Sequence, residues 1–188
     1  MYTLDELKEI THSCRRCRLC SGRNNVVFGQ GNHEANIMFI GEGPGREEDL
    51  QGLTFVGAAG QLLTKAIEGI GFKREEVYIA NIVKCRPPNN RNPQEDEMQA
   101  CIPYLRWQVK LIKPKIIVCL GSIAAKNIID KNLRITRQRG QWVEKKGVKI
   151  LPTFHPAALL RDDGKKRPFW EDFKEVKRVY EELIAKAD

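Results

Sequence analysis

Four short apolar runs divide the chain and predict its strands. They cover residues 37–40, 77–83, 115–120 and 148–152. Continuous hydrophobicity is typical of strands that are buried on both faces of a parallel sheet. Lys146-Gly147 precedes the last run and favours a tight hairpin turn at that point. The pattern therefore predicts four strands in one mainly parallel sheet.

Segments with helical spacing alternate with these runs. We expect helices that begin near residues 3, 58, 92, 121 and 169. Thr3 and Glu6 form a capping box for the first helix. Asn92 followed by Pro93 is a strong start for the third, which should extend to about Lys113. Alternating strands and helices predict an α/β fold, a three-layer sandwich with a mainly parallel four-stranded central sheet.

Length and hydropathy narrow the class of protein. A chain of 188 residues is long enough for one domain with a substantial core, so we expect a single domain over residues 1–188. The hydrophobic content of 41% is ordinary, and no apolar run approaches the roughly 20 residues that a membrane helix needs. The N-terminus lacks the basic and apolar regions of a signal peptide. We therefore expect a cytoplasmic protein without a membrane segment.

The charge distribution favours a polyanionic partner. The chain carries 32 basic and 24 acidic side chains, a formal net charge of +8. Excess positive charge suits nucleic acid, because each neutralised phosphate releases condensed counterions. A basic surface that binds nothing is an equally good reading of charge alone. The densest basic segment has a single acid, Glu144, among Arg134, Arg137, Arg139, Lys145, Lys146 and Lys149.

Four of the six cysteines have the arrangement of a metal site. Without an export signal, cysteines argue for metal or redox chemistry rather than for a disulfide framework. Cys14 and Cys17 form a C-x-x-C pair that can hold one metal or cluster with two thiolates. Cys85 and Cys101 are the natural candidates for the other two. Spacing alone leaves zinc and an iron-sulfur cluster open, with some preference for a cluster that ties the N-terminal segment to the domain.

The two other cysteines have different expected roles. Cys119 lies inside the apolar run KIIVCL and is best interpreted as a buried structural thiol. Cys20 is a spare thiol or an alternative ligand. A ferredoxin-type carrier is disfavoured, since the spacing that continues such a motif after Cys20 meets Asn24 instead of a cysteine.

Polar or special-backbone residues follow three of the predicted strands. Residues 41–45 read GEGPG, Asn81 is followed by KCRPP at 84–88, and TFHPA at 153–157 contains His155. In a parallel α/β sheet the ligand crevice lies beyond the carboxyl ends of the strands, so these segments form a site hypothesis. A dinucleotide site is disfavoured, because Pro44 lacks an N–H and the loop runs into acidic residues.

The ordered motifs GEGPG, GLTFVGAAG, Asn81, CRPPNNRNP and HPAALL resemble the uracil-DNA glycosylase superfamily, most closely family 4, the iron-sulfur uracil-DNA glycosylases. The resemblance extends from Cys14 to Leu160. It implies a DNA-repair hydrolase that flips uracil out of single- or double-stranded DNA and hydrolyses its N-glycosidic bond. The products would be free uracil and an abasic site. It also implies a structural 4Fe-4S cluster on Cys14, Cys17, Cys85 and Cys101.

The resemblance further implies a uracil-binding site on Gly41, Glu42, Gly43, Phe55, Asn81 and His155. The Phe55 ring would stack on the base, and the Asn81 amide would pair with its Watson-Crick edge. An amide offers the donor and acceptor that complement uracil and mismatches the exocyclic amine of cytosine. The backbone of Glu42 and Gly43 would contact the base.

His155 is the expected catalytic donor. A hydrogen bond from this histidine to a uracil carbonyl would stabilise the negative charge that develops on the leaving base. The best-known relatives have an aspartate where this chain has Gly43, so the usual general base is absent. We expect Glu42 to take part of its role, with Glu47 as the second candidate.

DNA contacts are expected from Arg86, Arg91 and Arg161. Leu159 or Leu160 would wedge into the duplex where the base leaves. The alternative for both leucines is a helix that packs in the core. No histidine stands between His33 and His155 and no lysine has the setting of a nucleophile, so we expect neither covalent capture of DNA nor strand cleavage.

Other functions and partners stay open at this point. The alternative function is an iron-sulfur or zinc protein that binds nucleic acid without glycosylase activity. We expect a monomer, and association with a replication clamp or a polymerase would suit a repair enzyme.

Overall fold

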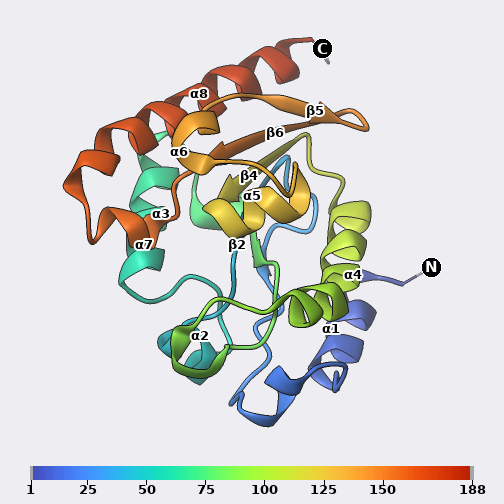
Figure 1. The fold of residues 1–188 in the computed structure, drawn as a ribbon. Coiled ribbons are helices and arrows are strands. Elements are labelled where there is room, and N and C mark those ends of the chain that lie inside the picture. Colours follow the sequence, from blue (N-terminus) through green and yellow to red (C-terminus); the bar gives the residue numbers. More distant parts are fainter. Residues whose placement is uncertain (1, 187–188) are drawn as a thin grey trace.

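A six-stranded sheet crosses the middle of the protein, with helices on both faces (Figure 1). The structure is a computed structural model that describes residues 2–186. The strand order is β1-β3-β2-β4-β6-β5. The strands are β1 (Gln30–Gly31), β2 (Ile37–Gly41), β3 (Tyr78–Asn81), β4 (Ile116–Leu120), β5 (Val143–Lys145) and β6 (Val148–Thr153). The four inner strands are parallel, and β1 and β5 pair antiparallel at the edges.

The inner strands are the four that the apolar runs predict. The expected number of strands is wrong, because the sheet has six strands instead of four. β1 and β5 are only two and three residues long, too short to produce a hydrophobic pattern. β5 joins β6 through the expected hairpin, in which Lys146 and Gly147 both have positive φ, 51° and 79°. The sheet therefore gains two short antiparallel edges.

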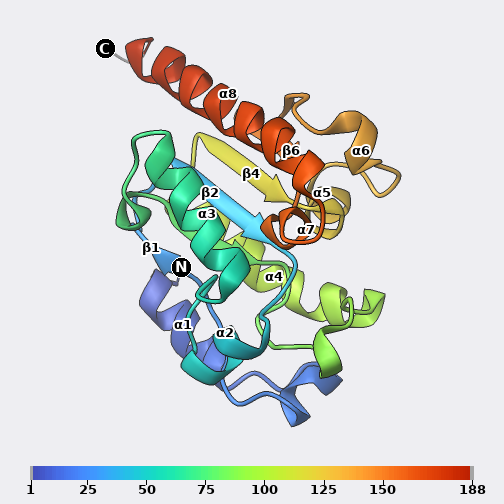
Figure 2. The same ribbon diagram turned by 90° about the vertical axis from the view of Figure 1, so that its left-hand side faces the viewer.

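Helices form two layers around this sheet. The helices are α1 (Leu4–His12), α2 (Arg46–Gln51), α3 (Ala58–Gly69), α4 (Glu95–Ile112), α5 (Ser122–Ile128), α6 (Ile135–Gln138), α7 (Pro156–Leu159) and α8 (Lys166–Ala185). Met38 and Ile40 of β2 pack with side chains of α1, α4 and α5. Ile37 and Phe39 face the opposite way and pack with α3 and α8. Figure 2 shows α3 and α8 from the side, and the three-layer sandwich is confirmed.

The start of α4 differs from the prediction. Asn92 and Pro93 precede the helix, and Gln94 is its N-cap. The Glu97 carboxylate accepts a hydrogen bond from the Gln94 N–H at 2.8 Å and closes the capping box. The helix ends at Ile112, as expected ahead of Pro114. Lys113, its C-cap, has the left-handed conformation.

The carboxyl ends of β2, β3, β4 and β6 meet at one edge of the sheet. Hydrogen bonds continue past the strands there: the N–H groups of Ile82 and Val83 donate to the carbonyls of Gly41 and Glu42. The GEGPG loop is thereby fixed beside the segment that follows Asn81. Among the described residues, no helix has both the length and the apolar character needed to span a membrane.

Candidate active site and cysteine cavity

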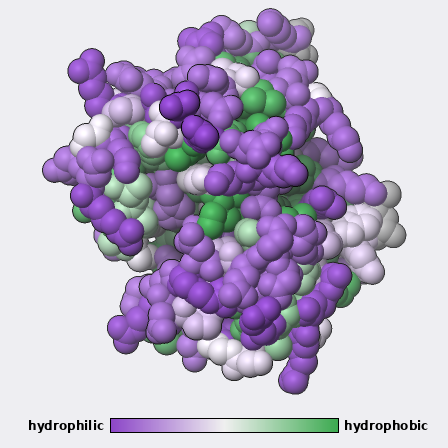
Figure 3. Space-filling model, viewed as in Figure 1, coloured by the Kyte–Doolittle hydropathy of each residue, from purple (hydrophilic) through white to green (hydrophobic). Residues whose placement is uncertain are grey.

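Three segments that are far apart in the sequence meet around a cleft of about 550 Å³ at this edge. The predicted site residues that line it are Glu42, Gly43, Glu47, Phe55, Asn81, Arg91, His155 and Arg161. Gly41, Arg86 and Leu159 are not part of this lining. The surface drawn in Figure 3 is largely hydrophilic, and hydrophobic residues are visible mainly in a hollow across its middle.

Asn81 has the most unusual environment in the cleft. It ends β3, and only 1% of its surface is exposed. Within residues 2–186, its Oδ1 is the single buried side-chain oxygen or nitrogen without a hydrogen-bond partner. Such an atom costs free energy in the protein alone, on the order of 1–3 kcal/mol. Oδ1 is therefore available to accept a hydrogen bond from a ligand.

Gly41 makes room for the side chains of the pocket. A Cβ at this position would lie 2.6 Å from Asn81 Oδ1 and 2.6 Å from Phe55 Cζ. At Gly43, a Cβ would lie 2.7 Å from Val83 Cγ2. Any side chain at this position would therefore require the Val83 side chain to move.

Phe55 reaches the cleft through a strained backbone. Its φ of 47° lies in the left-handed region, which is a genuine outlier for a bulky side chain. The ring lies beside the His155 ring, with centroids 5.6 Å apart and planes 29° apart. Strain of this kind is held in place by surrounding structure and clusters at functional sites.

Glu48 supplies part of that surrounding structure, and the sequence analysis missed it. Its carboxylate accepts hydrogen bonds from the N–H groups of Gly45 at 3.1 Å, Val56 at 2.9 Å and Gly57 at 2.9 Å. One side chain therefore ties the GEGPG loop to the loop that presents Phe55. The available signal was a glutamate at the third position of α2, where a capping-box carboxylate stands.

His155 is held as a neutral hydrogen-bond donor. Its Nδ1 faces the Ala157 N–H at 3.0 Å and must accept that bond, so the ring proton lies on Nε2. Burial lowers the pKa of His155 to about 4; nearby Glu48 raises it in part and Arg161 lowers it further. The ring is therefore uncharged at neutral pH.

The two candidate carboxylates differ in environment. Glu42 is half-buried at the end of β2, and burial raises the pKa of its carboxyl above the ordinary value. Glu47 is exposed on the first turn of α2, at the rim. A partly desolvated carboxylate is the better general base, which favours Glu42.

Cys14, Cys17, Cys85 and Cys101 line a second, small cavity of about 10 Å³, and Cys20 lines it too. This common lining is what the spacing of the cysteines predicted. Cys119 is fully buried in β4, apart from this cavity, as expected for a structural thiol. Within the described part of the chain, no three side chains of metal-ligand type come close enough to hold a single ion.

The chemistry of the cavity fits a thiolate-bound metal group. The Arg23 guanidinium donates to Cys85 Sγ and the Lys84 N–H donates to Cys101 Sγ, each at 3.3 Å. Donors of this kind suit sulfur that carries negative charge. Burial raises the pKa of Cys101 to about 11, so an isolated thiolate is disfavoured and a positive metal centre would offset that cost.

Comparison with known proteins decides the family. The model of the uracil DNA glycosylase superfamily matches residues 28–177. A type-4 uracil-DNA glycosylase of Sulfurisphaera tokodaii is 47% identical, over 95% of this chain and 86% of the relative. The chain belongs to the type-4 uracil-DNA glycosylase family. The family member of Archaeoglobus fulgidus is 45% identical over 94% of this chain and 92% of its own. That of Thermotoga maritima is 46% identical over 100% and 96%. The resemblance found in the sequence is confirmed.

The side chains expected to contact DNA in this family member are not all placed to do so. Leu159 is 1% exposed and packs in the core against α3 and α8, whereas Leu160 is 54% exposed. The wedge expected at either leucine is therefore not at Leu159. Arg161 is exposed and lines the cleft.

The arginines of the proline-rich loop have partners inside the protein. Arg91 forms two hydrogen bonds with the buried Glu97 carboxylate, at 2.9 and 2.7 Å. Arg86 Nε donates to Asn90 Oδ1 at 2.7 Å. These contacts shape the loop, and they leave Arg161 as the better placed of the three for DNA.

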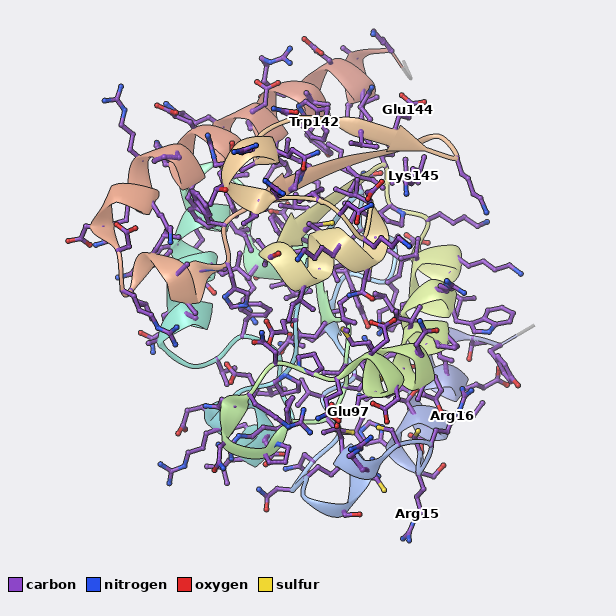
Figure 4. The ribbon with its side chains drawn as sticks, in the orientation of Figure 1. Arg15, Arg16, Glu97, Trp142, Glu144 and Lys145 are labelled. Carbon is purple, nitrogen blue, oxygen red and sulfur yellow. The ribbon has the colours of Figure 1, made fainter. Side chains whose placement is uncertain are left out.

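The basic segment near the hairpin is also partly used for structure. Arg139 pairs with buried Asp172 at 3.0 Å, and Lys149 pairs with Glu144 at 3.1 Å. Lys145 donates to the carbonyls that end α5. Figure 4 shows Lys145 near Glu144 in the upper part of the molecule and Arg15 at the bottom. These three basic side chains thus have partners inside the protein.

Proposed function

We propose that this chain is a DNA-repair uracil-DNA glycosylase that hydrolyses the N-glycosidic bond of a flipped deoxyuridine, releasing uracil and leaving an intact strand with an abasic site. The observation that carries the proposal is the unpaired Oδ1 of buried Asn81, in a cleft that also contains the donor of His155. We also propose that the chain acts as a single domain and as a monomer. Association with a clamp or a polymerase stays a prediction.

Asn81 would select uracil by its Watson-Crick edge. Uracil has an N3–H that can donate to the unpaired Oδ1, and a neighbouring carbonyl that can accept from the Asn81 amide N–H. Cytosine has no N3–H and presents an amine, so both bonds would fail. The Phe55 ring, held beside His155, would stack on the base.

His155 would stabilise the leaving group. Cleavage builds negative charge on uracil, and the Nε2–H, fixed by the Nδ1 bond to Ala157, donates to a uracil oxygen. The neutral ring already has the Nε2–H that donates, so His155 does not have to be protonated at neutral pH to fill this role. The loss of one such donor typically lowers the rate by about 10²–10³.

Glu42 would act on the sugar side of the bond. Its half-buried carboxylate can accept a proton from the attacking water and stabilise the positive charge that develops on the deoxyribose. Glu47 is too exposed to be desolvated in this way. Glu48 would hold the two loops through its three N–H bonds and so keep Glu42 and Phe55 in place.

Leu160 and Arg161 would contact the DNA around the flipped nucleotide. Leu160 projects from the end of α7, directly after the motif that contains His155, and can fill the space left in the base stack. Arg161, which lines the cleft, would pair with a backbone phosphate.

A 4Fe-4S cluster would be held by Cys14, Cys17, Cys85 and Cys101, with Cys20 outside the ligand set. These residues line one cavity and receive N–H donors at two of the sulfurs. The cluster would supply structural cross-linking between the N-terminal segment and the domain. The hydrolysis itself needs only the cleft residues.

The test is incubation of the purified protein with an end-labelled oligonucleotide that contains one uracil, followed by alkali. We expect scission at the uracil after alkali, none before it, and none with cytosine at that position. His155→Ala should lower the rate by about 10²–10³. His12→Ala, an exposed histidine of α1, is the matched control and should keep the wild-type rate. Absence of scission with the wild-type protein would reject the function.

A further inference from the structure

Lys84 is a buried cation three residues after Asn81. It is 1% exposed, which is rare for a lysine because the charge loses its hydration. An apolar side chain of similar length would fill the same space without that cost. The position of this charge therefore needs an explanation beyond packing.

The ammonium is held between the recognition strand and α4. Its Nζ donates to the main-chain carbonyl of Asn81 at 2.9 Å and to Gln108 Oε1 at 2.6 Å. Gln108 is itself fully buried, and its Nε2 donates to the Phe28 carbonyl at 2.8 Å and faces Tyr78 Oη at 3.2 Å. The carbonyl of Asn81 is thus connected through Lys84 to a fixed residue of α4.

The sheet supplies no strand partner for that carbonyl. The Asn32 N–H donates to the Val77 carbonyl on the β1 side of β3, and the Ile82 N–H donates to Gly41 on the β2 side. Main-chain groups alternate along a strand, so the carbonyl of Asn81 points toward β1. β1 pairs with Tyr78 and Ile79 only and ends before it reaches Asn81. The Lys84 ammonium therefore donates to the Asn81 carbonyl in place of β1.

We propose that Lys84 is a positioning residue for uracil recognition, whose buried ammonium fixes the main chain of Asn81 and thereby the direction of its side-chain amide. This inference rests on the proposed role of Asn81. The main chain of Lys84 is fixed as well: its carbonyl accepts from the Val27 N–H at 2.7 Å and its N–H donates to Cys101 Sγ at 3.3 Å. The main chain that carries the ammonium is therefore itself held by two hydrogen bonds.

A double-mutant cycle tests whether Lys84 acts through Asn81. Lys84→Met keeps most of the stem and removes both hydrogen bonds, and we expect it to lower kcat/KM on a uracil oligonucleotide by about 10-fold or more. The loss should fall on kcat, with KM for DNA little changed, and the inhibition constant of free uracil should rise. In an Asn81→Ala background the same change should alter kcat/KM by less than about 3-fold, because coupled residues are not additive. Equal losses in both backgrounds would overturn the inference.

Two companion variants separate this role from general damage. Tyr78→Phe removes a hydroxyl at the far end of the same network and leaves both bonds of the ammonium, so it should keep kcat/KM within about 2-fold. A 10-fold loss in Tyr78→Phe would attribute the effect to the network as a whole and overturn the inference. If Lys84→Met does not fold, Gln108→Leu releases the ammonium from α4 and should show the same non-additivity with Asn81→Ala.

The outcome also separates this inference from the proposed function. If Asn81→Ala alone keeps the wild-type rate, the assignment of Asn81 fails and Lys84 loses its target. If Asn81→Ala is impaired and Lys84→Met lowers the rate of both backgrounds equally, only the role of Lys84 fails. The visible absorbance of the purified Lys84→Met protein should equal that of the wild type. A loss of absorbance together with equal losses in both backgrounds would attribute the effect to a bound cluster and overturn the inference.

Discussion

The cleft and the cysteine cavity meet in one short segment, yet they treat buried polar groups in opposite ways. Asn81 and Lys84 are both 1% exposed and three residues apart. The Asn81 side chain has an acceptor without a partner, while the Lys84 ammonium has two acceptors within 2.9 Å. The difference indicates that the cleft has an open hydrogen-bonding position for a ligand. In the proposed function, the cost of the unpaired acceptor of Asn81 is recovered when a base binds.

The same contrast extends to the surroundings of each region. At the cleft, Phe55 is held in a strained left-handed conformation. Toward the cysteine cavity, the buried Glu97 carboxylate is fully engaged, with Arg91 at 2.7 Å and with Arg18, next to Cys17, at 3.7 Å. The one unpaired buried side-chain atom of residues 2–186 thus lies in the cleft, whereas the buried carboxylate toward the cysteine cavity is paired.

The largest expected effect separates the two carboxylates of the cleft. Glu42→Gln should lower the single-turnover rate by about 100-fold or more, because a general base contributes about 10²–10⁴. Glu47→Gln, the matched change at an exposed site, should stay within about 3-fold of wild type. A larger loss at Glu47 than at Glu42 would move the base to the rim and contradict the link between burial and chemistry.

Removal of one cavity thiol should affect stability more than chemistry. Cys101→Ala should abolish the visible absorbance of the purified protein and lower the unfolding temperature by about 10 °C, because loss of a structural metal costs several kcal/mol. Cys119→Ala, a fully buried thiol outside the cavity, is the control and should keep the absorbance. A colourless wild-type protein that contains zinc would contradict the cluster.

The two leucines after His155 should separate DNA contact from packing. Leu160→Ala should lower activity on duplex DNA by about 10-fold and leave single-stranded DNA nearly unaffected, because only the duplex needs a wedge. Leu159→Ala should lower the free energy of unfolding by about 2–5 kcal/mol, with no preference between the two substrates. Equal activity of Leu160→Ala and wild type on duplex DNA would remove the wedge.

The smallest effect concerns the acid limb of the pH profile. Glu42 must be ionised to act as a base, so the rate should fall as pH drops through its pKa, which burial raises above 4.5. His155 has its pKa lowered to about 4 and stays neutral over that range. Glu42→Gln should flatten the limb. An inflection near 6.5 that survives Glu42→Gln would show that His155 titrates as an ordinary histidine.

Much of the fold could be predicted because it depends on local pattern. The four inner strands are uninterrupted apolar runs, and α8 has a clear apolar face of Phe169, Phe173 and Val176. The start of α4 was predicted two residues early, since Asn92-Pro93 is a good local start, whereas the capping box of Gln94 and Glu97 sets the actual one. Short edge strands have too few residues to form a pattern.

The cleft was found through its motifs, but its mechanics depend on contacts between distant segments. The structure brings Asn81, Phe55 and His155 together in one cleft, and their roles stay predictions. The role of Glu48 depends on N–H groups eight and nine residues further along, which no spacing rule identifies. The opposite environments of Leu159 and Leu160 depend on how α7 packs on α3. The hydrogen bond from the Lys84 ammonium to the Asn81 carbonyl is possible because β1 ends before it reaches Asn81.

In the proposed site, the unpaired Oδ1 of Asn81 accepts a hydrogen bond from the N3–H of uracil. The most direct measurement is inhibition of the glycosylase by free uracil and by 3-methyluracil, which lacks that N–H. Wild type should bind uracil at least about 10-fold more tightly, since the methylated base leaves the acceptor unpaired. Asn81→Ala should bind both bases with similarly weak affinity. Equal inhibition of the wild-type protein by the two bases would show that Oδ1 of Asn81 does not bind the N3–H.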